Sequence, residues 1–93
     1  VRIILTMGSV FMDFNKTSVF NVAELRQELI LIMLNEVIEA LEFKGYNPTN
    51  QLVGYLITGD LKYITTFNES RKKISKYERS EVLMAIINAY MGK

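Results

Sequence analysis

The sequence predicts an all-α protein, a small bundle of four to five helices. Helix start and stop signals, notably Gly45, the pair Asn47-Pro48, and Gly59, divide the chain into segments of helical length. Several of these segments carry apolar residues at the spacing of a buried helix face. With 93 residues, 49% of them hydrophobic, the chain has the size and composition of one folded domain. We expect residues 1–16 to form an N-terminal arm and residues 17–93 to form the domain.

The first helix is expected over residues 22–44. Asn21 can cap it, Glu24 follows three residues later as in a capping box, and Gly45 ends it. The apolar run at residues 29–34 covers the whole circumference of a helix. Such a helix must be covered on all sides, so it is either central or shared with a second copy of the chain. This pattern favours a homodimer.

The second helix is expected over residues 48–58. Asn47 caps it and Pro48 fills the first position, where a missing N–H costs nothing. Its buried face is expected to contain Leu52, Val53, Leu56 and Ile57. Gly54, in its interior, costs about 1 kcal/mol relative to Ala. We therefore expect another backbone to approach closely at this position, and a role in ligand binding is the alternative.

Three further helices are expected over residues 60–64, 69–77 and 80–91, with Asp60, Asn68 and Ser80 as their caps. The boundary near Arg79 is soft, and one long bent helix is the alternative. The last helix should bury a surface that consists of Val82, Leu83, Ile86, Ile87 and Tyr90.

Several functions are disfavoured by composition. The chain has no Cys and no His, which removes thiol and imidazole chemistry, and we expect no enzyme activity, no metal and no cofactor. The three carboxylates at Glu36, Glu39 and Glu42 are expected to form a solvated stripe. No apolar run approaches the roughly 20 residues that span a bilayer, so we expect a cytoplasmic protein without membrane insertion. Val1, Met7 or Met12 could be the natural start.

The segment "RKKISKYER" at residues 71–79 is the strongest charge feature. In one continuous helix Lys72, Lys76 and Arg79 would share a face, which could bind phosphates or an acidic partner. An ordinary solvated surface is the other interpretation. A small nucleic-acid-binding protein that uses residues 68–79 is the alternative function.

The string "ALEFKGYNPTNQLVGYLITGDLKYI" at residues 40–64 resembles the IreB/ReoM/YrzL family, as do "R..I.KYER.E" from Arg71 to Glu81 and "AY" at 89–90. These are small cytoplasmic regulators of low-GC Gram-positive bacteria. The residues that match the family motif are Gly45, Tyr46, Asn47, Pro48, Asn50, Gln51, Gly54, Tyr55, Gly59 and Asp60.

The resemblance implies an all-helical homodimer without enzymatic activity. It implies a substrate of a transmembrane Ser/Thr kinase that acts through protein partners on cell-wall synthesis and β-lactam tolerance, in part of the family through proteolysis of a cell-wall enzyme. Thr17, in "TSVF", matches the phosphorylated position. Arg71, Lys76 and Arg79 match the basic partner surface, which Lys72 would extend. Leu61, Thr65, Thr66 and Ser75 depart from the family pattern.

Overall fold

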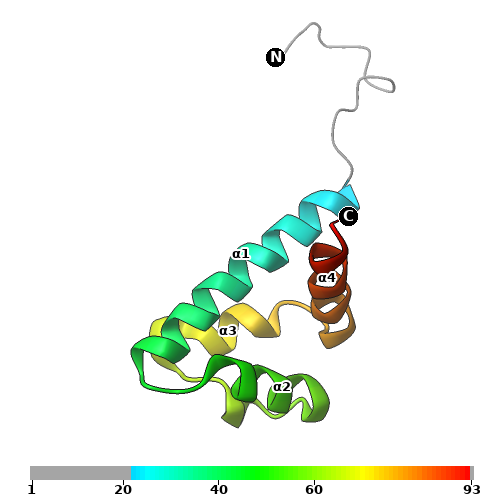
Figure 1. Cartoon of the computed structure of the whole chain (residues 1–93). Coiled ribbons are helices and arrows are strands. Elements are labelled where there is room, and N and C mark those ends of the chain that lie inside the picture. The colour runs from blue at the N-terminus through cyan, green and yellow to red at the C-terminus, as the bar shows by residue number, and fades with distance from the viewer. Residues whose placement is uncertain (1–21, 93) are drawn as a thin grey trace, which may run out of the picture.

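The computed structural model describes residues 22–92, and within them every regular element is helical (Figure 1). The elements are α1 (Val22–Phe43), α2 (Pro48–Thr58), the 3-10 turns η1 (Leu61–Tyr63) and η2 (Phe67–Glu69), α3 (Ser70–Ser75) and α4 (Arg79–Met91). The longest helix, α1, contacts α2, α3 and α4. Figure 1 shows α4 beside the N-terminal half of α1, and α3 and α2 toward its C-terminal end. The predicted all-α bundle is confirmed.

The first four stop and start signals act as predicted. Gly45 and Gly59 both have the positive φ that ends a helix, at 86° and 76°. The Asn47 side chain accepts a hydrogen bond from the Asn50 N–H at 3.1 Å, and Asp60 accepts one from the Lys62 N–H at 2.9 Å. Local chemistry therefore set the bounds of α2 and of η1.

The predicted caps of the last two helices were wrong. Asn68 does not cap a helix that begins at residue 69; Asn68 and Glu69 both adopt the left-handed conformation, and α3 begins at Ser70. Ser80 does not cap α4, because Glu78 is the N-cap and its side chain forms a capping box with Glu81. The extended backbone of Glu78 separates α3 from α4, which excludes one long bent helix.

The core lies along one side of α1. Its contributors from this helix are Ile30, Met33, Leu34, Val37 and Leu41, and they meet Tyr55, Ile64, Ile74, Val82 and Ala85 from the other elements. The apolar run predicted burial on all sides of α1, and the described residues 22–92 do not reach it. Leu29 remains 45% exposed and Ile32 remains 53% exposed. They form an apolar edge beside the core face.

Two predicted buried faces were right only in part, since Leu52 and Leu56 of α2 pack against the core and Val82 of α4 is buried. In α2, Tyr55 is buried whereas Val53 and Ile57 are exposed. In α4 the buried residues are Val82 and Ala85, three positions apart; the predicted Leu83, Ile86, Ile87 and Tyr90 are exposed. A helix that packs against a single neighbour buries only a narrow line of side chains. The small Ala85, at 2% exposure, lies on that line.

Gly54 is explained by a side chain rather than by the backbone that we expected. A Cβ atom at this position would lie 2.4 Å from Cε1 of Tyr63. The Gln51 amide fixes the same turn, because its Nε2 donates to the Tyr63 carbonyl at 3.0 Å. The glycine therefore opens a place for the Tyr63 ring on the surface of α2.

Candidate functional site

Four basic residues were predicted to form a partner surface, and the structure divides them. Arg71, Lys72 and Lys76 line one shallow hollow together with Leu61 and Ser75, and we call this set the basic hollow. Arg79 lies in another hollow, next to Tyr55, Leu56 and Tyr77. The break between α3 and α4 separates them, so Lys72, Lys76 and Arg79 do not share one helical face.

Arg79 binds the C-terminal end of α2. Its Nη1 atom donates to the carbonyl of Leu56 at 3.1 Å and to that of Ile57 at 3.4 Å. These carbonyls lack partners within the helix, so the guanidinium satisfies them and complements the helix dipole. A Cβ at Gly59 would lie 2.9 Å from the Arg79 Cζ atom, so the glycine also makes room for this contact. Arg79 thereby connects α4 to α2, the helix that contains most of the family motif.

Arg71 is a partly buried residue of the basic hollow. Its Nε donates to the Ile64 carbonyl at 2.7 Å, and the side chain is partly buried. Ile64 itself is fully buried in the core. Arg71 therefore holds the turn after η1 against α3, and part of its charge remains at the hollow.

Lys72 and Lys76 are the accessible charges of the basic hollow. The Lys72 side chain is 80% exposed and pairs with Glu69 at 3.4 Å, a contact of little energetic weight at a surface. Lys76 is exposed and forms no ion pair within residues 22–92. Lys76 also borders a second hollow that α1 lines with Leu29, Ile32, Met33 and Glu36. Next to it, Lys73 pairs with Glu36 at 3.2 Å.

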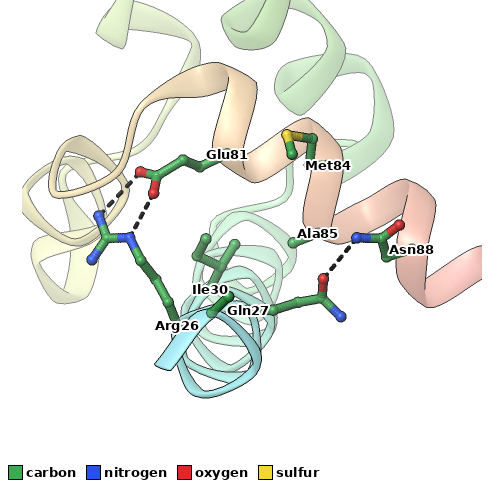
Figure 2. A pocket seen from close by; sticks show the side chains of 8 residues that line it. Arg26, Gln27, Ile30, Glu81, Met84, Ala85 and Asn88 are labelled. Carbon is green, nitrogen blue, oxygen red and sulfur yellow. Dashed lines mark hydrogen bonds and ion pairs between the residues drawn. The ribbon is translucent and has the colours of Figure 1, made fainter. Parts of the chain in front are cut away.

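An ion pair between α1 and α4 was not foreseen from the sequence. Arg26 holds Glu81 with two hydrogen bonds, from Nε to Oε2 at 2.5 Å and from Nη2 to Oε1 at 3.0 Å (Figure 2). Glu81 Oε1 also accepts from the Glu78 N–H at 3.1 Å. The hydrogen bond from Arg26 lowers the pKa of Glu81 from 4.5 to about 2. The partners are 55 residues apart, so no local pattern could have connected them.

The Arg26–Glu81 pair closes one end of a small hollow between α1 and α4. At the other end Asn88 donates to the Gln27 side chain at 2.9 Å (Figure 2). Ile30, Met84 and Ala85 line the space between, which has a volume of about 230 Å³. The Arg26 guanidinium also lies 5.0 Å from the centroid of the Tyr77 ring, a cation–π contact.

Thr17, the predicted phosphorylation site, lies outside the described residues. Residues 22–92 contain no group of three or more carboxylate, His or Cys side chains placed to hold a metal ion. In the same range no helix combines the length and the apolar character needed to cross a bilayer.

The motif residues have mainly structural tasks in this geometry. They end α1, cap α2 at its start, seat the Tyr63 ring and begin η1. Tyr46, at 50% exposure, and the exposed side chain of Asn50 have no such task in this geometry. The accessible charges of the basic hollow are instead Lys72 on α3 and Lys76 at its C-cap.

A family model described as IreB regulatory phosphoprotein matches residues 15–92. The match includes Thr17, the whole glycine-containing motif, the basic hollow and both partners of the Arg26–Glu81 pair. The chain therefore belongs to the IreB regulatory phosphoprotein family.

Proposed function

We propose that this protein is a non-enzymatic adaptor that a membrane Ser/Thr kinase controls by phosphorylating Thr17. Membership of a family of regulatory phosphoproteins supports a regulator that works by binding. The resemblance noted in the sequence suggests a partner in cell-wall synthesis or in the proteolysis linked to it, and a role in β-lactam tolerance. Thr17 is the position that corresponds to the phosphorylated Thr of the family.

The basic hollow is the observation that carries the binding role. Lys72 and Lys76 point two accessible ammonium groups from one side of α3, and Arg71 ties that helix to the buried Ile64. Charges on a rigid element recognise a partner at a smaller entropic cost than charges on a loose one. Because the surface is basic, the partner should offer carboxylates or phosphates there.

A homodimer is part of the same proposal. The apolar edge of Leu29 and Ile32 is about half exposed, and on α4 Tyr90 is 91% exposed. Exposed apolar residues in such density are typical of protein interfaces. A second copy of the chain that covers the α1 edge would complete the burial that the apolar run demands.

Phosphorylation is tested with a bacterial kinase domain of the penicillin-binding-associated type, ATP and the full chain, followed by peptide mass spectrometry. We expect one phosphate on Thr17 and none in the Thr17→Ala variant. Labelling of another residue, with Thr17 unmodified, would refute the site. Thr65 and Thr66 are internal comparisons, since they are hydroxyl residues of the same chain.

The partner surface is tested by pull-down with the full chain as bait. Lys72→Gln and Lys76→Gln together should reduce recovery of the partner at least tenfold, whereas Lys44→Gln, outside the hollow, should not. Thr17→Ala and Thr17→Glu baits should differ in what they recover. Unchanged recovery with the Lys72/Lys76 variant would contradict the surface. Salt-sensitive binding to duplex DNA that the same variant abolishes would favour the nucleic-acid alternative.

A further inference from the structure

Two exposed phenylalanines stack on each other where the C-terminal end of α1 meets η2. The ring centroids of Phe43 and Phe67 lie 4.8 Å apart, and the ring planes are inclined by only 17°. Phe43 remains 73% exposed and Phe67 remains 40% exposed. We call these two residues the aromatic pair. Aromatic rings gain most from burial, so a stacked pair that the fold leaves at the surface is a candidate interaction site.

The backbone around Phe67 is fixed at a conformational cost. The Phe67 N–H donates to the Thr65 hydroxyl at 3.1 Å, and the hydroxyl of the fully buried Ser70 donates to the Phe67 carbonyl at 2.7 Å. The next two residues, Asn68 and Glu69, have positive φ values of 56° and 59°, which side-chain-bearing residues adopt rarely. Phe67 is thus held rigidly in the aromatic pair, and a rigid ring binds a partner with little loss of conformational entropy.

The charges next to the aromatic pair favour a cationic occupant. Glu39 lies four residues before Phe43, so the two side chains are neighbours on one exposed face of α1. Glu42 directly precedes Phe43, and within residues 22–92 neither carboxylate forms an ion pair. One cation is close, since the Lys44 ammonium lies 5.6 Å from the centroid of the Phe67 ring. Two open carboxylates against a single ammonium leave a net negative charge beside the pair.

A guanidinium group matches both the rings and the carboxylates. The π face of an aromatic ring attracts cations, and a planar guanidinium stacks on such a face. Its N–H groups remain free at the edges, where they can donate to a carboxylate one helical turn away. The Lys44 contact shows that the pair already attracts a cation. Because Phe67 stacks on one face of Phe43 and Phe43 is 73% exposed, the opposite face is open to a second cation.

We propose that the aromatic pair is a docking site for an arginine side chain of a protein partner, with the guanidinium stacked on Phe43 and paired with Glu39. None of these residues lines the basic hollow, so this is a second surface, and it selects the opposite charge. The inference goes beyond the proposed function and does not rest on phosphorylation. A partner that uses both surfaces presents arginine to the end of α1 and acidic groups to the basic hollow.

Solution NMR on the full chain tests the site, because the ring protons of Phe43 and Phe67 report directly on a stacked ligand. The probe is a short acetylated and amidated peptide of alternating glycine and arginine. Two matched peptides replace arginine with lysine, which has the charge without the plane, or with citrulline, which has the plane without the charge. We expect the arginine peptide to shift the ring resonances and to bind at least about fivefold more tightly than either matched peptide.

Single substitutions at exposed positions separate the contributions of ring and carboxylate without disturbing the core. Phe43→Leu should weaken binding of the arginine peptide about tenfold, because the stacking face is lost. Glu39→Gln should weaken it about threefold, because the paired carboxylate is lost. Glu28→Gln, the same change at an exposed site in the first half of α1, should leave binding unchanged. Lys44→Gln should strengthen binding about twofold, because the ammonium no longer competes for the rings.

Equal binding of the three peptides would overturn the inference, as would binding that Phe43→Leu does not weaken. Two other occupants would refute it as well. A second copy of the chain is the occupant if Phe43→Leu changes the mass in light scattering from two chains to one. A single-stranded oligonucleotide is the occupant if it shifts the ring resonances and the arginine peptide does not.

The variant with both Lys72→Gln and Lys76→Gln separates this site from the basic hollow. It should lose the partner that the basic hollow recovers and still bind the arginine peptide as the unmodified chain does. Failure of the proposed function and failure of this inference are therefore distinguishable.

Discussion

Gly54 is the residue with the most direct structural reason for its identity. A Cβ there would lie 2.4 Å and 2.5 Å from two carbons of the Tyr63 ring, closer than such atoms approach in folded proteins. Gly54→Ala gains about 1 kcal/mol of helix propensity but displaces the ring, and overpacking of this kind costs ~1–3 kcal/mol. We expect a net loss of about 1 kcal/mol in the free energy of unfolding, measured by urea denaturation.

The control for this prediction is the same substitution without the ring. In a Tyr63→Ala background, Gly54→Ala should stabilise the protein by up to about 1 kcal/mol, because only the propensity gain remains. The sign of the effect therefore reverses between the two backgrounds. Destabilisation in both would show that the ring is not the cause.

Glu81 should make stability depend on pH in the acid range. Its pKa is about 2 in the folded protein and 4.5 in the absence of the fold, so between these values the unfolded chain binds more protons. The contribution of Glu81 is therefore complete above pH 4.5 and is lost as the pH falls toward 2. Thermal unfolding at a series of pH values should show this loss.

Glu81→Gln should reduce the loss of thermal stability that occurs as the pH falls from 4.5 toward 2. Arg26→Gln should reduce this loss as well, because the hydrogen bond from Arg26 is the largest cause of the lowered pKa. A loss that stays unchanged in Arg26→Gln would mean that the pair does not form in solution.

At the scale of elements, α2 is held by a different contact at each end. Asn47 caps its start through the Asn50 N–H at 3.1 Å. Replacement of an Asn N-cap by Ala costs about 1 kcal/mol, whereas Ser supplies an equivalent acceptor. Asn47→Ala should therefore lower the unfolding free energy by about that amount, and Asn47→Ser should restore most of it, as measured by chemical denaturation. Equal losses in both variants would count against the cap.

Arg79 holds the other end of α2 and belongs to α4. Arg79→Gln should increase amide hydrogen exchange in the last turn of α2, because the carbonyls of Leu56 and Ile57 lose their donor. Lys76→Gln, an exposed change of equal charge, should leave that exchange as it was. Exchange that is equal in both variants would assign Arg79 to the partner surface alone, as the sequence first suggested.

At the scale of the whole molecule, the elements of residues 22–92 leave several large apolar side chains exposed. Leu29 and Ile32 on α1 and Ile87 on α4 are all about half exposed. Light scattering at micromolar concentration should give the mass of two chains. The Ile32→Glu variant should have the mass of one chain, because burial of a carboxylate in an apolar contact is costly. Asn50→Glu adds the same charge at an exposed site on α2 and should leave the mass of two chains.

The helices of this fold were largely predictable from the sequence, but the side chains that each helix buries were predicted only in part. The bounds of α1 and α2 were predicted within one residue, because capping and stop signals act over three or four neighbouring positions. The start of α4 was also predicted within one residue, but its cap was wrong because Glu78 takes the task expected of Ser80, and the left-handed Asn68 and Glu69 shortened α3. In α4 the buried Val82 was predicted, whereas the small Ala85 was missed because large side chains were preferred.

The sequence by itself determined an all-helical chain, its principal turns and its family, since these depend on short-range signals and on a long, specific motif. Tertiary structure alone decided that Arg79 serves α2, that Arg71 serves the turn after η1, and that Arg26 meets Glu81. A long flexible side chain takes whichever acceptor the fold brings within about 3 Å, and no local pattern records that choice. The division between basic residues that hold the fold and those left open to a partner therefore required the structure.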